Sequence, residues 1–287
     1  MDIRKAVFPA AGFGTRFLPV TKAIPKEMLP LLDKPLIQYS VEEAKESGLE
    51  EVIIVTGMGK TAIEDHFDVS FELEILLKEK NKTDILKMVE EVSNLIHFSY
   101  TRQKKPLGLG HAIYCAKNLV GKEPFAVFLS DDVINAKIPV MKQMIKVFRQ
   151  YPSTILAVQR VPRKEVHHYG IIDAKKIGPR VYKVIDMVEK PHPKNAPSNL
   201  AIIGRYILTP EIFYALEETR PGKGGEIQLT DGLRKLSKKQ PIYAYEFEGD
   251  RYDAGDKLGF LMANVSFALN RGDLKKEFRR FLKGLDI

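Results

Sequence analysis

Short apolar runs alternate with amphipathic segments along the first 160 residues, and this alternation limits the fold more than any other feature of the sequence. The runs KAVFPA and EVIIVTG have the length of buried strands. The Val/Ile run without polar alternation is typical of a parallel strand covered on both faces. Strands that alternate with helices predict an α/β fold with right-handed crossover helices.

After residue 160 the predicted secondary structure changes from alternating strands and helices to mostly strands. HHYGIIDAKK, RVYKVIDMVEK and NLAIIGRYIL are rich in strand formers, and PHPKNAPSN joins the last two. We expect these strands to be inserted beside a mixed, mostly parallel, Rossmann-like sheet flanked by helices. Because no linker is long or polar enough to separate two units, we predict one domain over 1–287. Its halves are about 1–160 and 161–255, followed by terminal helices over 256–287.

The charge of the chain favours an anionic ligand. The formal net charge is +8 at pH 7, which suits a nucleic acid or small phosphates. A basic cluster over 275–283 alternates with Leu and Phe at helical spacing, so we interpret it as the solvated face of a terminal helix. Because the sequence carries no signature of a zinc finger, basic zipper or RNA-binding module, we expect no nucleic-acid partner.

The cysteine content and the lengths of the apolar runs exclude several classes of protein. Cys115 is the single cysteine, so an intramolecular disulfide and a cysteine-rich metal site are impossible. No apolar run approaches the roughly 20 residues that span a bilayer. The N-terminus lacks the apolar region and cleavage site of a signal peptide. We therefore expect a cytoplasmic chain without a membrane partner.

A glycine-containing loop follows the first expected strand. Glycines in AAGFGTR allow the backbone to approach a phosphate and direct its N–H groups at the oxygens. A dinucleotide-binding fingerprint is excluded because Phe17 stands where a small residue is required, and a Walker A loop is excluded because no lysine follows Gly14. The loop continues with three prolines, and Arg16, Lys22 and Lys26 lie on it. A stiff loop with these cations predicts a triphosphate clamp.

The segment AAGFGTRFLPVTKAIPKEMLP closely resembles the signature of bacterial UTP–glucose-1-phosphate uridylyltransferases, in the sugar-phosphate nucleotidyltransferase family. The resemblance extends over essentially the whole chain. It implies a nucleotide-diphospho-sugar transferase fold, with a nucleotide half and a sugar half. It also implies Mg²⁺ as cofactor and a homo-oligomer, either a tetramer or a dimer. In this loop the implied nucleotide-binding residues are Ala10, Ala11, Gly12, Gly14 and Thr15.

A second loop, in QKKPLGLGHA, follows a strand and opens a helix. Its glycines let the backbone approach a planar base, and the Gln103 amide offers the donor and acceptor that fit the imide edge of uracil. In the resembled family the residues that match Gln103 and Gly108 bind uracil. We interpret His111 as a residue at the helix start and not as a catalytic base.

Acidic residues stand where metal ligands are expected. Asp131 and Asp132 end the strand PFAVFLSDD, and ligands of open α/β sheets sit at the carboxyl ends of strands. Mg²⁺ is commonly bound by one or two carboxylates plus phosphate oxygens. The resemblance makes Asp131 a metal ligand and implies a second one, Asp253, in the loop RYDAG. We expect Asp132 to support the loop by hydrogen bonding and to bind the sugar.

The sugar side is implied by several short motifs. The motif EKP places Glu189 where it can accept hydrogen bonds from sugar hydroxyls and Lys190 where it can hold the sugar phosphate. Gly170, Asn199 and Gly204 are expected in the same pocket. The segment GGEIQLTD also resembles the family, and Glu226 and Asp231 within it are expected to order the sugar side.

The resemblance implies transfer of the uridylyl group of UTP to glucose 1-phosphate, giving UDP-glucose and pyrophosphate. The nucleophile is an ionised phosphate oxygen, so no general base is required, and catalysis depends on positioning and charge neutralisation. The residues expected to act are Arg16, Lys26, Asp131 and Lys190. The alternatives are a thymidylyltransferase that uses dTTP, a metal-dependent glycosyltransferase and a non-catalytic nucleotide-sugar sensor.

Overall fold

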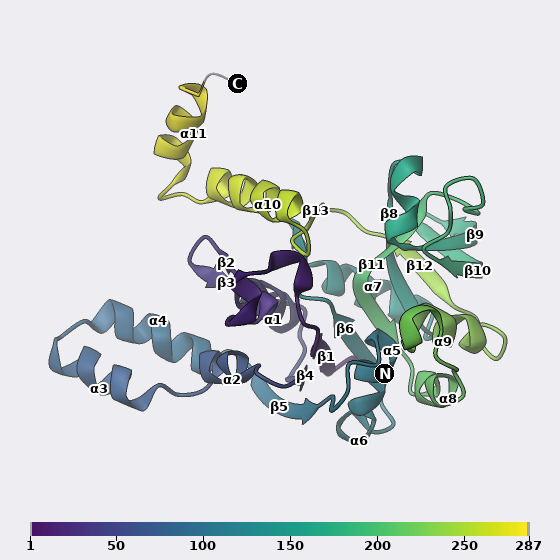
Figure 1. The fold of residues 1–287 in the computed structure, drawn as a ribbon, viewed down its shortest axis with the longest axis horizontal. Coiled ribbons are helices and arrows are strands. Elements are labelled where there is room, and N and C mark those ends of the chain that lie inside the picture. Colours follow the sequence, from purple (N-terminus) through teal and green to yellow (C-terminus); the bar gives the residue numbers. More distant parts are fainter. Residues whose placement is uncertain (1, 286–287) are drawn as a thin grey trace.

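The computed structural model describes residues 2–285, apart from the side chain of Lys223, and its centre is a nine-stranded mixed sheet (Figure 1). Across the sheet, the strands are β5 (His97–Arg102), β4 (Glu51–Thr56), β1 (Lys5–Ala10), β6 (Phe125–Phe128), β11 (Leu200–Leu208), β8 (Ile155–Arg160), β12 (Tyr243–Glu246), β10 (Val181–Glu189) and β9 (Gly170–Gly178). The first four strands are parallel, as the uninterrupted apolar runs predict. β11 runs antiparallel to both of its neighbours and begins the β-rich half.

Helices cover both faces of the sheet because each strand sends alternate side chains to opposite faces. In β1, Ala6 and Phe8 join one core cluster and Val7 joins the other. The first cluster includes side chains from α1 (Leu36–Glu46), α2 (Thr61–Phe67) and α7 (Val140–Gln150). The second includes side chains from α5 (Leu109–Cys115), α6 (Lys117–Val120), α8 (Glu211–Glu217) and α9 (Leu229–Leu236).

Two helical pairs extend beyond this body (Figure 1). α3 (Phe71–Glu79) and α4 (Thr83–Ser93) project on one side, and α10 (Lys257–Asn270) leads to α11 (Lys275–Lys283) near the C-terminus. Every helix among the described residues is too short or too polar to cross a membrane.

Two short antiparallel ribbons complete the part of the fold that carries the site. β7 (Asp132–Asn135) pairs with β13 (Asp250–Asp253), and β2 (Pro30–Leu31) pairs with β3 (Lys34–Pro35). The register of the first ribbon sets Asp132 directly opposite Asp253. The proline-rich loop contains only 3₁₀ turns, at Thr15–Phe17, Val20–Lys22 and Lys26–Met28, as its composition predicts.

The structure sets the bounds of the helices near the second loop. GLGHAIYCAKNL is divided into α5 and α6 at Ala116. The segment GGEIQLTD becomes helical only at Leu229, because the backbone of Ile227 instead bonds the second loop. Its N–H donates to the Leu107 carbonyl, and its carbonyl accepts from Gly110, both at 2.8 Å.

Candidate active site

A polar cavity of about 220 Å³ lies where the loop after β1, the loop after β6 and the β-rich half meet. Eight of the residues predicted from the sequence line it: Arg16, Asp131, Asp132, Gly170, Glu189, Lys190, Gly204 and Asp253. The carboxyl ends of β1 and β6 meet at the same edge because these strands are parallel neighbours. The parallel sheet therefore explains why segments more than 100 residues apart share one cavity.

The first glycine loop is folded back over Lys26. Gly14 has φ of 64°, a left-handed conformation that suits glycine, and a Cβ there would lie 2.9 Å from Cβ of Lys26. The Thr21 hydroxyl donates to the Gly14 carbonyl at 2.8 Å. Gly12 has open space above it, with nothing within 4 Å of a Cβ position. The loop thus leaves room for a ligand at Gly12 and holds Lys26 beneath Gly14.

The residue after Lys26 anchors the loop in the protein interior. The side chains of Glu27 and Lys60 are only 2% and 7% exposed and form an ion pair of 2.7 Å. Lys60 lies directly before α2, so this pair ties the loop to a different part of the sheet edge. Charged residues are fully buried almost only when they are paired. The sequence did not predict this pair, because no local pattern indicates that Glu27 is buried or that Lys60 is its partner.

Lys26 reaches the predicted metal ligand. Its Nζ donates to Oδ2 of Asp131 at 2.6 Å. Burial opposes both charges, but each charge stabilises the other, so the pKa of Lys26 is raised and the pKa of Asp131 is lowered. Both groups are therefore ionised at neutral pH.

Asp131 and Asp253 face the same small space beside Gly255. A Cβ at Gly255 would lie 2.9 Å from Oδ1 of Asp253 and 3.0 Å from Oδ2 of Asp131. Burial and the nearby Asp132 raise the pKa of Asp253, which is the effect expected when carboxylates gather without enough positive charge. No cluster of three or more His, Cys, Asp or Glu within residues 2–285 could hold a metal by itself. Two carboxylates plus substrate phosphates are nonetheless a usual Mg²⁺ ligand set, so these residues fit the ion.

Asp132 is a buried support. Its Oδ2 accepts from the Gly204 N–H at 2.7 Å, and its Oδ1 accepts from Nε of Arg251. A Cβ at Gly204 would lie 2.5 Å from the same Oδ2, so glycine is required for this close approach. Asp132 also lines the cavity, and both of its oxygens are bonded to residues of neighbouring strands.

Two arginines organise the acidic residues, and the sequence reasoning missed both. Arg251 bonds Asp132, donates to Asp253 at 3.1 Å and donates to the Tyr169 hydroxyl at 3.1 Å. It lies two residues before Asp253 on β13, so the two side chains share a face of the ribbon. Like charges opposite one another destabilise a strand pair, and Arg251 offsets this repulsion between Asp132 and Asp253.

Arg205 holds the backbone around Asp131. It is 1% exposed and donates to the carbonyls of Leu129 and Asp132, each at 3.0 Å. Glu43 neutralises it through a bond of 2.8 Å. A sequence signal was present, because a cation inside the otherwise apolar strand NLAIIGRYIL must have buried partners.

Most of the residues predicted to bind the sugar line the cavity, and Asn199 does not. Thr230 donates to Oε2 of Glu189 at 2.6 Å. A Cβ at Gly170 would lie 3.2 Å from Oε2 of Glu189 and 3.2 Å from the Thr230 hydroxyl oxygen. Lys190 has φ of 46°, a conformation that costs a residue with a side chain about 1–2 kcal/mol. Such strain is concentrated at functional sites. Asn199 is not among the cavity-lining residues; its amide instead bonds Arg160 and the carbonyl of Val161.

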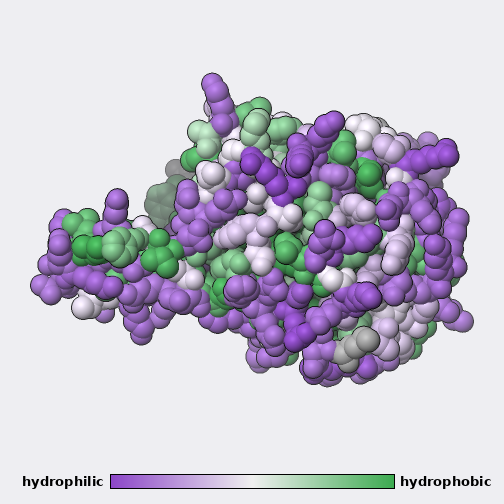
Figure 2. Space-filling model, turned by 90° about the horizontal axis from the view of Figure 1, so that it is seen from below, coloured by the Kyte–Doolittle hydropathy of each residue, from purple (hydrophilic) through white to green (hydrophobic). Residues whose placement is uncertain are grey.

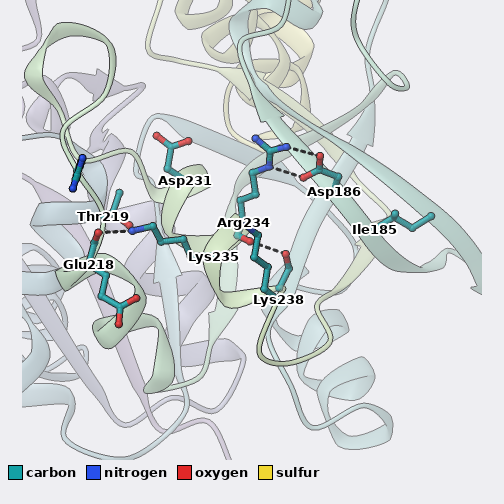
Figure 3. A pocket seen from close by; sticks show the side chains of 10 residues that line it. Ile185, Asp186, Glu218, Thr219, Asp231, Arg234, Lys235 and Lys238 are labelled. Atoms are coloured by element: carbon teal, nitrogen blue, oxygen red, sulfur yellow. Dashed lines mark hydrogen bonds and ion pairs between the residues drawn. The ribbon is translucent and has the colours of Figure 1, made fainter.

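Asp231 faces a different pocket, which is shown in Figure 3. This open pocket of about 770 Å³ lies on the solvent side of α9, where Arg234 forms two bonds with Asp186. A helix turns by about 100° per residue, so Thr230 points into the cavity and Asp231 points away from it. Glu226 bonds Gln228 and also lies outside the cavity lining.

Gln103 and Gly108 lie in the loop after β5, at the same sheet edge as the first glycine loop. Gly108 has φ of 92°, and a Cβ there would lie 2.8 Å from Cβ of Glu226. Its conformation and the close approach of the 226–227 backbone therefore both require glycine. The Gln103 side chain is buried and donates to the Gly108 carbonyl at 3.1 Å.

The fold and this site define a nucleotidyltransferase. The family model described as nucleotidyl transferase matches residues 5–268, so the chain belongs to this family. A UTP–glucose-1-phosphate uridylyltransferase of Bacillus subtilis is 55% identical over 283 residues, which cover 99% of this chain and 97% of that protein.

Solved structures show the same similarity. A UDP-glucose pyrophosphorylase complexed with UDP-glucose is 50% identical, with a TM-score of 0.87 over 94% of this chain and 100% of that one. A UTP-bound UGPase from Acinetobacter baumannii is 39% identical, with a TM-score of 0.92 over 99% of this chain and 100% of that one. The chain is thus similar over its whole length to enzymes that carry the uridylyltransferase name.

Proposed function

We propose that this protein is a UTP–glucose-1-phosphate uridylyltransferase, which forms UDP-glucose and pyrophosphate. The observation that carries the proposal is the 55% identity over 99% of the chain to an enzyme of that name. The cavity supports it, because Arg16, Lys190 and Arg251 border it together with three aspartates. Cations for phosphates and carboxylates for a divalent metal are what the joining of two polyanions requires.

The residues have distinct roles in this proposal. Arg16 and Lys26 bind the β- and γ-phosphates of UTP. Arg16 lines the cavity, and Lys26 packs against Gly14 of the first glycine loop. Lys190 holds the phosphate of glucose 1-phosphate, and Glu189 accepts hydrogen bonds from its hydroxyls. A phosphate oxygen of the sugar then attacks the α-phosphorus, and pyrophosphate departs on the opposite side.

The nucleotide contacts the first glycine loop, in AAGFGTR, and the second loop, in QKKPLGLGHA. Gly12 and its neighbours approach the nucleotide through their backbone, and Gln103 with Gly108 binds uracil. Asp131 and Asp253 would hold Mg²⁺. When bound, the ion supplies positive charge that neutralises the phosphates during transfer.

The experiment is a pyrophosphate-release assay with Mg²⁺, glucose 1-phosphate and each of ATP, CTP, GTP, UTP and dTTP. Release with UTP far above the others is the expected result. Release mainly with dTTP would replace the uridylyltransferase by a thymidylyltransferase. Folded protein that releases pyrophosphate with none of them would contradict nucleotidyl transfer and favour a glycosyltransferase or a sensor.

We also propose that the protein is a cytoplasmic homo-oligomer, a dimer or a tetramer. Leu258, Leu261 and Met262 of α10 are 68%, 61% and 53% exposed, which is unusual for a helix face without a partner. Hydrophobic side chains also gather on the projecting part of the surface in Figure 2. Among the residues of α3 and α4, Phe71 and Met88 are 69% and 64% exposed. Light scattering after gel filtration tests this, and a monomer at micromolar concentration would contradict it.

A further inference from the structure

The Gln103 amide is locked by two acceptors. Gln103 is 6% exposed, and its Nε2 lies 3.1 Å from the Gly108 carbonyl and 2.9 Å from Nδ1 of His111. A primary amide carries two N–H groups, so both are engaged. Oε1 accepts from no group in the described part of the chain and is left as the hydrogen-bonding atom that a ligand can use.

His111 can accept this bond only when Nδ1 carries no proton. Burial lowers the pKa of His111, which favours the neutral ring. Cys115, one helical turn further, places Sγ 3.8 Å from the same Nδ1, and burial raises the pKa of this thiol. The thiol therefore keeps its hydrogen and also presents a donor, so the ring proton resides on Nε2. A reversed amide would set Oε1 against two acceptors.

We propose that His111 is a positioning residue that fixes the Gln103 amide with its oxygen toward the nucleobase, and thereby selects uracil over cytosine. This inference rests on the proposed function of the site. Uracil offers N3–H, which can donate to Oε1. Cytosine has an unprotonated N3 at the same position, so two acceptors would meet. Sites built around a particular hydrogen bond reject a ligand that leaves their buried polar groups unpaired.

The test compares kcat/KM for UTP and CTP in the wild type, His111→Leu and His111→Asn. Leucine removes the acceptor and leaves an N–H of Gln103 unpaired, so the UTP:CTP ratio falls by about tenfold. Asparagine carries Oδ1 at the position of Nδ1 along the side chain, so it retains the ratio. His66→Gln changes another half-buried histidine and serves as the control.

The outcomes separate the two proposals. A wild type that does not use UTP contradicts the proposed function itself. A wild type that selects UTP, together with an unchanged ratio in His111→Leu, overturns only the role of His111, as does equal loss in His111→Asn and His111→Leu. If the leucine variant does not fold, nitrogen-15 NMR of the wild type decides. A neutral His111 ring protonated at Nε2 supports the inference, and a proton on Nδ1 overturns it.

Discussion

Nζ of Lys26 lies 2.6 Å from Oδ2 of Asp131, so the cation expected at the β- and γ-phosphates is paired with the carboxylate expected to hold Mg²⁺. The two residues are 105 positions apart in the chain. The glycine loop brings them together because Gly14 allows the backbone to pack directly on Lys26. The residue proposed to bind phosphate and the residue proposed to bind the metal thus form one ion pair.

Asp131→Asn tests the metal role. Loss of one charged ligand at such a site should lower kcat by about 100-fold, and the Mg²⁺ concentration for half-maximal rate should rise. Steady-state rates across a Mg²⁺ titration measure both quantities. Asp231→Asn makes the same change on the solvent side of α9 and should alter kcat less than about twofold. Equal effects of the two substitutions would contradict the assignment.

Lys190→Ala tests the phosphate-holding role on the sugar side. We expect kcat to fall by about 100-fold while the Kd for UTP stays within about threefold, because the proposed contact of Lys190 is with the phosphate of glucose 1-phosphate and not with UTP. Calorimetry gives the Kd, and pyrophosphate release gives kcat. Lys175→Ala, at an exposed position on β9, is the matched control. An unchanged turnover number in Lys190→Ala would contradict the proposed role.

Arg251→Met removes the cation between the buried carboxylate of Asp132 and the partly exposed carboxylate of Asp253. The Arg251 side chain is 8% exposed, so Asp132 and Asp253 would remain opposite each other without their shared partner. Breaking a buried pair in this way costs about 3–5 kcal/mol in the free energy of unfolding. Urea unfolding measures the loss. Adding Asp132→Asn should recover part of it, and a loss under about 1 kcal/mol in the single variant would show that Arg251 is dispensable.

Lys60→Met examines how the Lys26 loop is anchored. The substitution leaves Glu27 buried and uncompensated, and should lower the free energy of unfolding by about 3 kcal/mol. The double variant with Glu27→Gln should be more stable than Lys60→Met alone, since no unpaired charge remains. A double-mutant cycle in urea determines the coupling. Additive effects would mean that the two side chains do not act as a pair.

The stability of the protein should depend on His66 below neutral pH. Burial lowers its pKa, so between the folded value and about 6.5 the unfolded chain binds a proton that the folded chain does not. The free energy of unfolding therefore falls as pH decreases through this range. His66→Gln keeps a donor for the Gln38 amide, which His66 contacts at 3.0 Å, but does not titrate. Urea unfolding at pH 7.5 and 5.5 should show a smaller decrease for the variant, and equal decreases would refute this role.

Much of the site was accessible from the sequence because its residues lie in loops with strong local signals. Glycine loops after strands and acids at strand ends must meet at one sheet edge if the strands are parallel neighbours. Arg16, Asp131 and Gln103 each lie in a loop that follows one of the parallel strands. The motif EKP added Lys190 and Glu189 through a family resemblance, and all except Gln103 line the cavity.

The tertiary structure decided which of these residues touch and which buried groups support them. Arg205 bonds carbonyls 76 and 73 positions away, and Arg251 bonds a carboxylate 119 positions away. No local pattern encodes such pairings, because they depend on strand register and on how β7 and β13 meet. The orientation of α9 likewise turned Thr230 into the cavity and Asp231 out of it. The hydrophobic periodicity of the sequence predicted the α/β fold, and its loop motifs, together with the family resemblance, predicted the chemistry at the strand ends. Long-range packing alone set the distances and charges through which that chemistry acts.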